Sequence, residues 1–213
     1  MNNLSEDKAH KPNWIQPIVM MLSVWIIIES EIICSIVPNY TVGIVLALIV
    51  WIVASVIIFH KLKKQNVEYA YYTNHSFTGR DYLILFFVVM SGVTMASNNY
   101  LNVGVRPLVI REYFSGNLLY TIRNIFYYPI EVFLMIMLIM CAQRGGELLT
   151  KKQLIPWGAL ALSFLWGLPH ILYHGFTDGI QSVLLAFIYS IPYYASDRNI
   201  KTSYVSMLIL WLM

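Results

Sequence analysis

The amino-acid sequence predicts an all-α fold, a polytopic integral membrane bundle of about seven transmembrane helices. Three observations support this prediction. Hydrophobic residues make up 58% of the 213 residues and charged residues only 12%, whereas a soluble domain is about 25% charged. The apolar residues lie in long blocks, each close to the ~20 residues that cross a hydrocarbon core. The blocks lack the two-residue alternation of membrane-barrel strands, so helices are the expected spans.

The first two spans follow a polar tail. Residues 1–13 are expected to form a cytoplasmic N-terminal tail, and apolar blocks follow at 14–37 and 41–59. The first block is too long for a signal-peptide core and lacks an obvious small-residue cleavage site, so we interpret it as a retained anchor. The second block ends in a basic run, His-Lys-Leu-Lys-Lys.

The remaining spans begin after a polar loop. A third block covers 82–97, and the mixed segment 98–116 is expected at the membrane interface or as a short re-entrant piece. The later blocks are 118–142, 154–173, 180–195 and 203–213. The last is too short to cross at 1.5 Å per residue, so its helix either continues in the native gene or stops part-way. We divide the chain after the tail into N-terminal transmembrane helices with the interfacial segment, 14–116, and a transmembrane core, 117–213.

The basic residues orient this bundle, because cytoplasmic loops collect Lys and Arg. When successive loops alternate sides, only Arg106 and Arg111 fall outside, and Arg123 lies within span four. All other basic residues fall on the inner side: Lys8, Lys11, Lys61, Lys63, Lys64, Arg80, Arg144, Lys151, Lys152, Arg198 and Lys201. The sequence therefore predicts a multi-pass cell-membrane protein with a cytoplasmic N-terminus and the lipid bilayer as its partner.

Charge and cysteine placement exclude two other classes. The net charge of +3 is small and its basic residues lie in short clusters between spans, so we expect no nucleic-acid partner. Cys34 and Cys141 fall in apolar blocks near opposite membrane faces, which excludes a disulfide framework. The run Gly145-Gly146-Glu147 is interpreted as the cytoplasmic end of span four rather than as a phosphate-binding loop.

Ionisable side chains inside the apolar blocks mark a candidate site, because a charge at membrane depth costs at least a few kcal/mol. Arg123, Tyr127 and Glu131 recur every four residues and so share one helical face. His174 lies one turn beyond His170. The charged or titratable residues expected at comparable depth, near the midplane or in the outer half, are Glu29, Glu31, Arg123, Glu131 and His170.

Two interpretations of these residues stay open. Glu131 and His170 at one depth suit general acid/base chemistry. A structural role is the alternative, because Glu29 or Glu31 paired with Arg123 would neutralise a buried charge. In the same interpretation, His170 would hydrogen-bond a carbonyl near a helix bend at the preceding proline.

A metal site is the weakest of these hypotheses. His170 and His174 are the candidate ligands, since imidazole binds Zn²⁺ well. Zinc takes at least three protein ligands, however, and no HExxH motif is present.

The segment Trp166-Gly167-Leu168-Pro169-His170 resembles the Phe-Gly-x-x-His motif of the CPBP family of intramembrane proteases. That family includes CAAX prenyl proteases and bacteriocin-processing or immunity proteins, and the resemblance runs from about Tyr127 to the chain end. It implies that Glu131 and His170 activate a water for attack on an amide, with a divalent metal such as zinc as a candidate cofactor. The residues expected to support that site or bind substrate are Arg123, Tyr127, Trp166, His174, Glu29 and Glu31.

The family's two other motifs are degenerate in this chain. In the Glu-Glu-x-x-x-Arg motif, Ile130-Glu131 keeps one glutamate and Met135 replaces the arginine. A register that uses Arg144 instead loses both glutamates, so depth favours Glu131. In the His-x-x-x-Asn motif, Met207 and Trp211 stand at the two functional positions.

Three functions follow as hypotheses. The first is an active intramembrane endopeptidase, a hydrolase in which Glu131 polarises water and His170 binds it or stabilises the oxyanion. The second is an inactive relative that binds another membrane protein or peptide as an immunity or regulatory partner. The third is a small transporter lined by the intramembrane charges, which no internal repeat supports.

Overall fold

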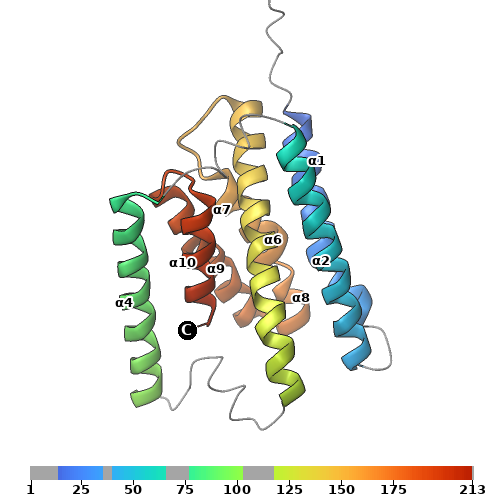
Figure 1. The fold of residues 1–213 in the computed structure, drawn as a ribbon, viewed down its shortest axis with the longest axis vertical. Helices are drawn as coiled ribbons and strands as arrows, with labels where there is room; N and C mark the ends of the chain where they lie inside the picture. The colour runs from blue at the N-terminus through green and yellow to red at the C-terminus, as the bar shows by residue number, and fades with distance from the viewer. Residues whose placement is uncertain (1–13, 36–39, 66–76, 103–117, 213) are drawn as a thin grey trace, which may run out of the picture.

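The computed structural model describes residues 14–35, 40–65, 77–102 and 118–212. Within these residues the secondary structure is helical and contains no strand, which confirms the predicted all-α class. The helices are α1 (Ile15–Ser35), α2 (Tyr40–Gln65), α4 (Gly79–Asn102), α6 (Leu118–Thr150), α7 (Trp157–Leu162), the π-helical turn η1 (Ser163–Gly167), α8 (His170–His174), α9 (Phe176–Ala195) and α10 (Ile200–Leu212), as Figure 1 shows. The predicted tail and most of the interfacial segment lie outside the described residues.

Helix α6 is the centre of the bundle. It packs against α1 and α2 on one side and against α7 and α10 on the other (Figure 1). Most of the apolar side chains from Val132 to Ala142 on α6 are at most 5% exposed. Helix α4 lies at the edge, where it contacts α10. A helix that is apolar around most of its circumference is stable only when neighbours or lipid cover it, and here α1, α2, α7 and α10 provide that cover.

Helix α6 continues beyond the apolar block that predicted it. From the sequence we expect span four to end at Gly145-Gly146-Glu147. In the structure the helix continues through these residues and stops at Thr150. A Cβ atom on Gly146 would lie 2.2 Å from Trp157 Cγ, and one on Gly145 would lie 2.8 Å from Ile18 Cγ1. The two glycines therefore permit close packing of α1 and α7 instead of terminating α6.

One segment of the described chain meets the length and composition expected of a membrane span. It is Ile125–Thr150 of α6, with 26 residues, while the shorter apolar helical segments are Ile15–Ser30, Val45–Ile58, Trp157–Leu172 and Ile200–Leu212. The structure thus contains one candidate membrane-spanning helix. The number of crossings stays a prediction.

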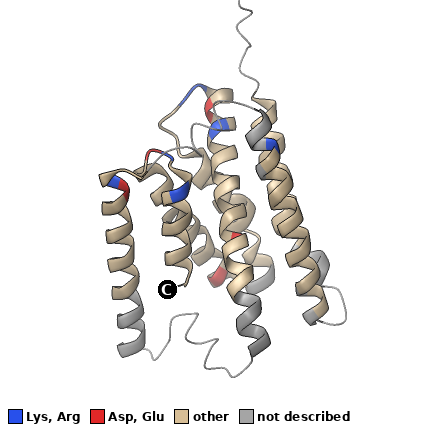
Figure 2. Ribbon diagram, viewed as in Figure 1, with Lys and Arg blue, Asp and Glu red and all other residues tan. Residues whose placement is uncertain are grey.

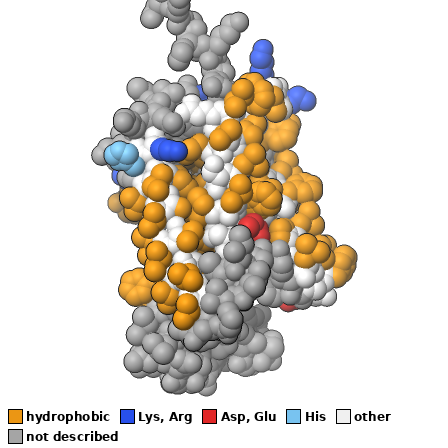
Figure 3. Space-filling model, turned by 90° about the vertical axis from the view of Figure 1, so that its right-hand side faces the viewer, with side chains coloured by type: hydrophobic (Ala, Val, Ile, Leu, Met, Phe, Trp, Pro, Cys, Tyr) orange, Lys and Arg blue, Asp and Glu red, His pale blue; other side chains and the backbone are white. Residues whose placement is uncertain are grey.

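The outer surface of the bundle is rich in large apolar side chains. Val56 of α2 is 64% exposed and Phe87 of α4 is also 64% exposed. Figure 3 shows one such face, where hydrophobic side chains spread over the described surface and Lys or Arg side chains lie near its upper end. This distribution inverts the usual arrangement of a soluble protein, in which large exposed apolar patches are rare.

The basic side chains of the described residues gather at one end of the bundle, uppermost in Figure 2. This is the end where α2 and α6 finish and where α1, α4 and α10 begin (Figure 1). The residues concerned are Lys61, Arg80, Arg144, Lys151, Lys152, Arg198 and Lys201. We call it the basic end.

Candidate functional site

Glu131 lies on α6 with a side chain only 6% exposed. Its charge acts on the hydroxyl group of Tyr189, which α9 supplies and which is 8% exposed. The carboxylate therefore faces the interior of the bundle. Such a placement is typical of an intramembrane group that is either functional or specifically paired.

The predicted fifth span is a broken helix, and the break precedes His170. In η1 the N–H of Leu168 donates to the carbonyl oxygen of Ser163, five residues earlier, at 2.8 Å. Pro169 has no N–H, so it cannot donate to the carbonyl of Leu165 as a helix would require. Trp25 of α1 replaces that donor, because its Nε1–H donates to Leu165 O at 2.8 Å. A π-helical turn of this kind is frequent at functional sites.

The imidazole of His170 is oriented by the same bend. Its Nδ1 lies 2.7 Å from the carbonyl oxygen of Trp166. Because a carbonyl oxygen only accepts, Nδ1 carries the proton, and Nε2 is the acceptor of the neutral ring. This contact is the carbonyl hydrogen bond that the structural interpretation predicts, and it also gives the ring the tautomer that a base at Nε2 requires.

Aromatic rings fill the space next to His170. The ring centroids of Trp166 and His170 are 4.6 Å apart. Trp211 of α10 packs against Trp166 at 5.3 Å and against Tyr189 at 5.0 Å. These separations are those of directly contacting rings. Trp211 therefore closes the region between α9 and η1 with its indole.

The two positions where the resembled family carries His and Asn are thus apolar packing positions. Met207 is fully buried and belongs to the main hydrophobic core, and Trp211 packs at its edge. Neither a thioether nor an indole can act as a general acid or base near neutral pH.

Glu131 and His170 flank one aromatic cluster. Glu131 acts on Tyr189, whose ring centroid is 6.4 Å from that of Trp166, and Trp166 contacts His170. Tyr127, also predicted as a supporting residue, packs instead against Trp51 of α2 at 4.9 Å. The structure therefore brings His170 and Trp166 into direct contact, leaves Glu131 on the Tyr189 side of these rings, and directs Tyr127 toward α2.

The other predicted site residues are located less completely. Glu29 is half-buried on α1. Glu31, Arg123 and His174 belong to α1, α6 and α8, but their side chains lie outside the described residues. The predicted pairing of Glu29 or Glu31 with Arg123, and His174 as the second candidate zinc ligand, therefore involve side chains outside the described residues.

The described side chains do not form a metal site. No three His, Cys, Asp or Glu side chains among them are grouped as metal ligands. Glu131 and His170 alone fall short of the three protein ligands that zinc takes.

A second polar cluster, at the basic end, is absent from the sequence predictions. Gln143 of α6 is 1% exposed, and its Nε2 donates to Glu147 Oε1 at 2.7 Å. Its Oε1 accepts from the hydroxyl of Tyr194 at 2.8 Å and from the N–H of Gly158 at 3.1 Å. One side chain thus joins α6, α7 and α9.

Arg198 completes this cluster with a bidentate ion pair to Glu147. Its Nη1 donates to Glu147 Oε2 at 3.0 Å, and its Nη2 donates to Oε1. The Glu147 side chain is 5% exposed and that of Arg198 is 23% exposed. Two parallel N–H···O bonds are the strongest arrangement for such a pair. We refer to Gln143, Glu147, Tyr194 and Arg198 as the basic-end network.

Asp81 connects α4 to α10 near the network. Its Oδ2 accepts from the Thr78 hydroxyl at 2.6 Å, and its Oδ1 accepts from the Thr202 hydroxyl at 2.8 Å. Burial raises the pKa of Asp81, but the hydrogen bonds from Thr78, Thr202 and Asn199 outweigh burial, so its pKa lies below the ordinary 3.8. The carboxylate is therefore held ionised.

Comparisons with known proteins identify no relative. No protein-family model, no curated protein and no solved structure matches this chain. The resemblance to the CPBP family accordingly stays a prediction from the motif residues.

Proposed function

We propose that this chain is a multi-pass membrane protein of the CPBP type that binds another membrane protein or peptide, as an immunity or regulatory partner, without cleaving it. The main observation behind this proposal is the packing of Trp211, whose ring centroid is 5.3 Å from that of Trp166 and 5.0 Å from that of Tyr189. In the family pattern this position supplies an asparagine. An indole packed among these rings replaces the amide side chain that the resembled family carries at this position.

Helix dimensions support the membrane part of the proposal. Helices α1, α2, α4, α6 and α9 contain 21, 26, 24, 33 and 20 residues. At 1.5 Å per residue each is about 30 Å long or longer, which matches a hydrocarbon core. The exposed apolar surface of α2 and α4 would then face lipid.

Charge placement supports the orientation. The basic side chains of the described residues lie at one end of the bundle (Figure 2), as expected for the cytoplasmic side. Reporter fusions after Lys64 and after Thr177 test this topology. We expect the first to be cytoplasmic and the second external; both on the same side would contradict it.

A protease is the second candidate, and one observation favours it. Nδ1 of His170 donates to the Trp166 carbonyl, so the neutral imidazole has its acceptor at Nε2, and Glu131 is buried in the same bundle. These are the two groups that general acid/base hydrolysis would use. Hydrolysis would also have to proceed without the asparagine that the family pattern has at the position of Trp211.

Partner retention distinguishes the two candidates. Membranes that express tagged wild-type protein, Glu131→Ala or His170→Ala would be solubilised mildly and the co-purified membrane proteins quantified. We expect the same partner at the same yield, and of the same intact mass, with all three. A partner that is full-length only with the two variants would instead identify it as a substrate.

A further inference from the structure

In the turn between α9 and α10, three successive side chains serve three different helices. Asp197 forms an ion pair with Arg80 of α4, and Arg198 forms one with Glu147 of α6. The Oδ1 atom of Asn199 accepts from two N–H groups in the first turn of α10, at 3.1 and 3.4 Å. This turn is therefore a junction of α4, α6 and α10 at the basic end.

The backbone of the turn is strained. Asp197 and Arg198 have φ angles of 48° and 67°, which lie in the left-handed region. Aspartate adopts this region more readily than most residues, whereas for arginine it is unfavourable. Such a conformation persists only where the surrounding structure holds it. At Arg198 the holding contacts include the ion pair with Glu147 and the backbone N–H, which donates to Tyr193 O at 2.8 Å. Loss of the ion pair would therefore free the turn to relax.

Helix α4 is attached next to the same turn. It lies at the edge of the bundle, and its main contact among the described helices is with α10 (Figure 1). Asp81 of α4 accepts from the Thr202 hydroxyl at 2.8 Å and is also hydrogen-bonded by the Asn199 side chain. Both of these donors lie within four residues of Arg198 in the chain. A change in the turn would thus move the groups that hold Asp81.

We propose that this turn is a conformational latch, which couples the attachment of α4 to the Arg198–Glu147 ion pair. While the pair is intact, it holds Arg198 in the left-handed conformation. Asn199 and Thr202 then stay within reach of Asp81. When the pair is lost, the turn relaxes and α4 loosens. Coupling of this kind is reciprocal, so release of α4 also weakens the contact with α6.

Two substitutions of Arg198 test the role of the strain. Arg198→Ala and Arg198→Gly both remove the ion pair, but only glycine adopts the left-handed region without a steric cost. Amide hydrogen exchange would be followed by mass spectrometry on the full chain in detergent. Residues 82–88 of α4 should exchange about tenfold faster with the alanine variant than with the glycine variant, which is the cost of a non-glycine residue in this region.

Without a latch, the opposite order is expected. Glycine loses more backbone freedom on folding than alanine does, so the glycine variant would then exchange at least as fast in residues 82–88. That result would overturn the proposal.

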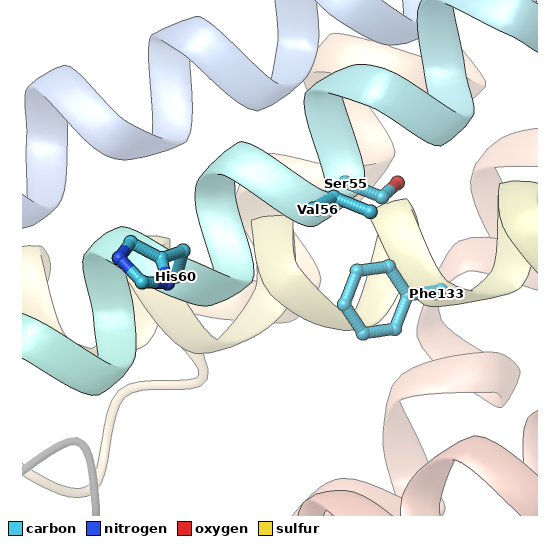
Figure 4. A pocket seen from close by; sticks show the side chains of 4 residues that line it. All are labelled: Ser55, Val56, His60 and Phe133. Carbon is cyan, nitrogen blue, oxygen red and sulfur yellow. The ribbon is translucent and has the colours of Figure 1, made fainter.

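Phe133→Ala is the control for a general loss of stability. Phe133 faces Val56 across a shallow groove between α2 and α6 (Figure 4). It precedes Glu147 by 14 residues, which is about 21 Å along a helix. The exchange rate of residues 82–88 relative to that of α1 should rise with Arg198→Ala and stay at the wild-type ratio with Phe133→Ala. An equal rise with both variants would overturn the proposal.

A second pair of variants tests the reverse direction, also in the event that Arg198→Ala does not fold. Thr202→Val removes the hydroxyl donor to Asp81 and keeps the shape of the side chain. We expect up to about tenfold faster exchange at residues 145–150 of α6, the effect of one hydrogen bond to a carboxylate. Thr94→Val is the matched control, because the Thr94 hydroxyl donates to Met90 O of the same helix at 2.7 Å. An unchanged end of α6 with Thr202→Val, or an equal response to both valine variants, would contradict the coupling.

Discussion

The basic-end network and the aromatic cluster around Glu131 and His170 use buried polar groups in different ways. In the network, Glu147 and Gln143 are paired with groups from α7, α9 and the turn before α10 at 2.7–3.1 Å. In the aromatic cluster, the neighbours are rings, with Trp166, Tyr189 and Trp211 between or next to the two polar side chains.

This difference suggests different roles. Mutual pairing across four elements stabilises one arrangement of helices, because breaking any one contact leaves a buried charge or amide unpaired. In the aromatic cluster, rings pack beside His170, and its Nδ1–H donates to the Trp166 carbonyl only four residues earlier, so that bond does not join distant elements. We therefore assign the network to stability, and recognition by the aromatic cluster stays part of the proposed function; the following predictions test the contrast between the two regions.

The largest effect is expected from breaking the network. Arg198→Ala leaves Glu147 as a buried charge without its bidentate partner, which should destabilise the protein by about 3–5 kcal/mol. Thermal unfolding in detergent measures the effect. Glu147→Met combined with Arg198→Met should recover much of the loss, because apolar replacement of both partners removes the buried charge.

The exposed ion pair Arg80–Asp197 is the matched control. Its side chains are 50% and 77% exposed, so Asp197→Ala should change stability by about 0–1 kcal/mol. Equal losses of stability in Arg198→Ala and Asp197→Ala would contradict the prediction that the buried network stabilises the protein more than an exposed ion pair does.

A smaller effect is expected at Gly167, beside the aromatic cluster. A Cβ atom there would lie 2.9 Å from Val183 Cα and 3.0 Å from Val183 N. Because these are backbone atoms of α9, Gly167→Ala must displace η1 and should cost about 1–3 kcal/mol. Gly79→Ala, whose Cβ would meet nothing within 4 Å, should leave the unfolding temperature nearly unchanged.

Trp25→Phe tests whether α1 holds the bend before His170. It removes the donor to the Leu165 carbonyl, which Pro169 leaves without a helical partner, and should cost about 1 kcal/mol. We expect faster amide hydrogen exchange in residues 163–172. Trp51→Phe is the control, because it removes a similar bond to Ile27 O, a carbonyl inside a regular helix. Hydrogen exchange in residues 163–172 should not respond to this change. Faster exchange with both variants would contradict the claim that the Trp25 hydrogen bond holds the bend.

The smallest effect is expected in the pH dependence of the unfolding temperature at acidic pH. Because the pKa of Asp81 in the folded protein is below 3.8, the carboxylate contributes stability above its unfolded pKa, and that contribution is lost as the pH falls through the folded value. The unfolding temperature of the wild type should therefore fall below about pH 4 more steeply than that of Asp81→Asn. Parallel pH profiles would show that Asp81 does not link α4 to α10.

The sequence predicts the fold class because composition and block length depend only on local residues. It also selects Glu131 and His170, since charges in apolar blocks are visible without a structure. It misses the basic-end network because Glu147 and Arg198 are 51 residues apart and meet only after α7 and α9 fold back along α6. The end of α6 is also missed, because Gly145 and Gly146 serve packing against Ile18 and Trp157, which lie elsewhere in the chain.

Replacing Glu131 and His170 together, and then quantifying every membrane-protein terminus in cells, tests most directly the claim that this chain binds without cleaving. If the chain binds without cleaving, we expect the same set of termini with the wild type and with Glu131→Ala/His170→Ala at equal expression. A terminus that appears with the wild type and disappears with the double variant would contradict it and identify the chain as a protease.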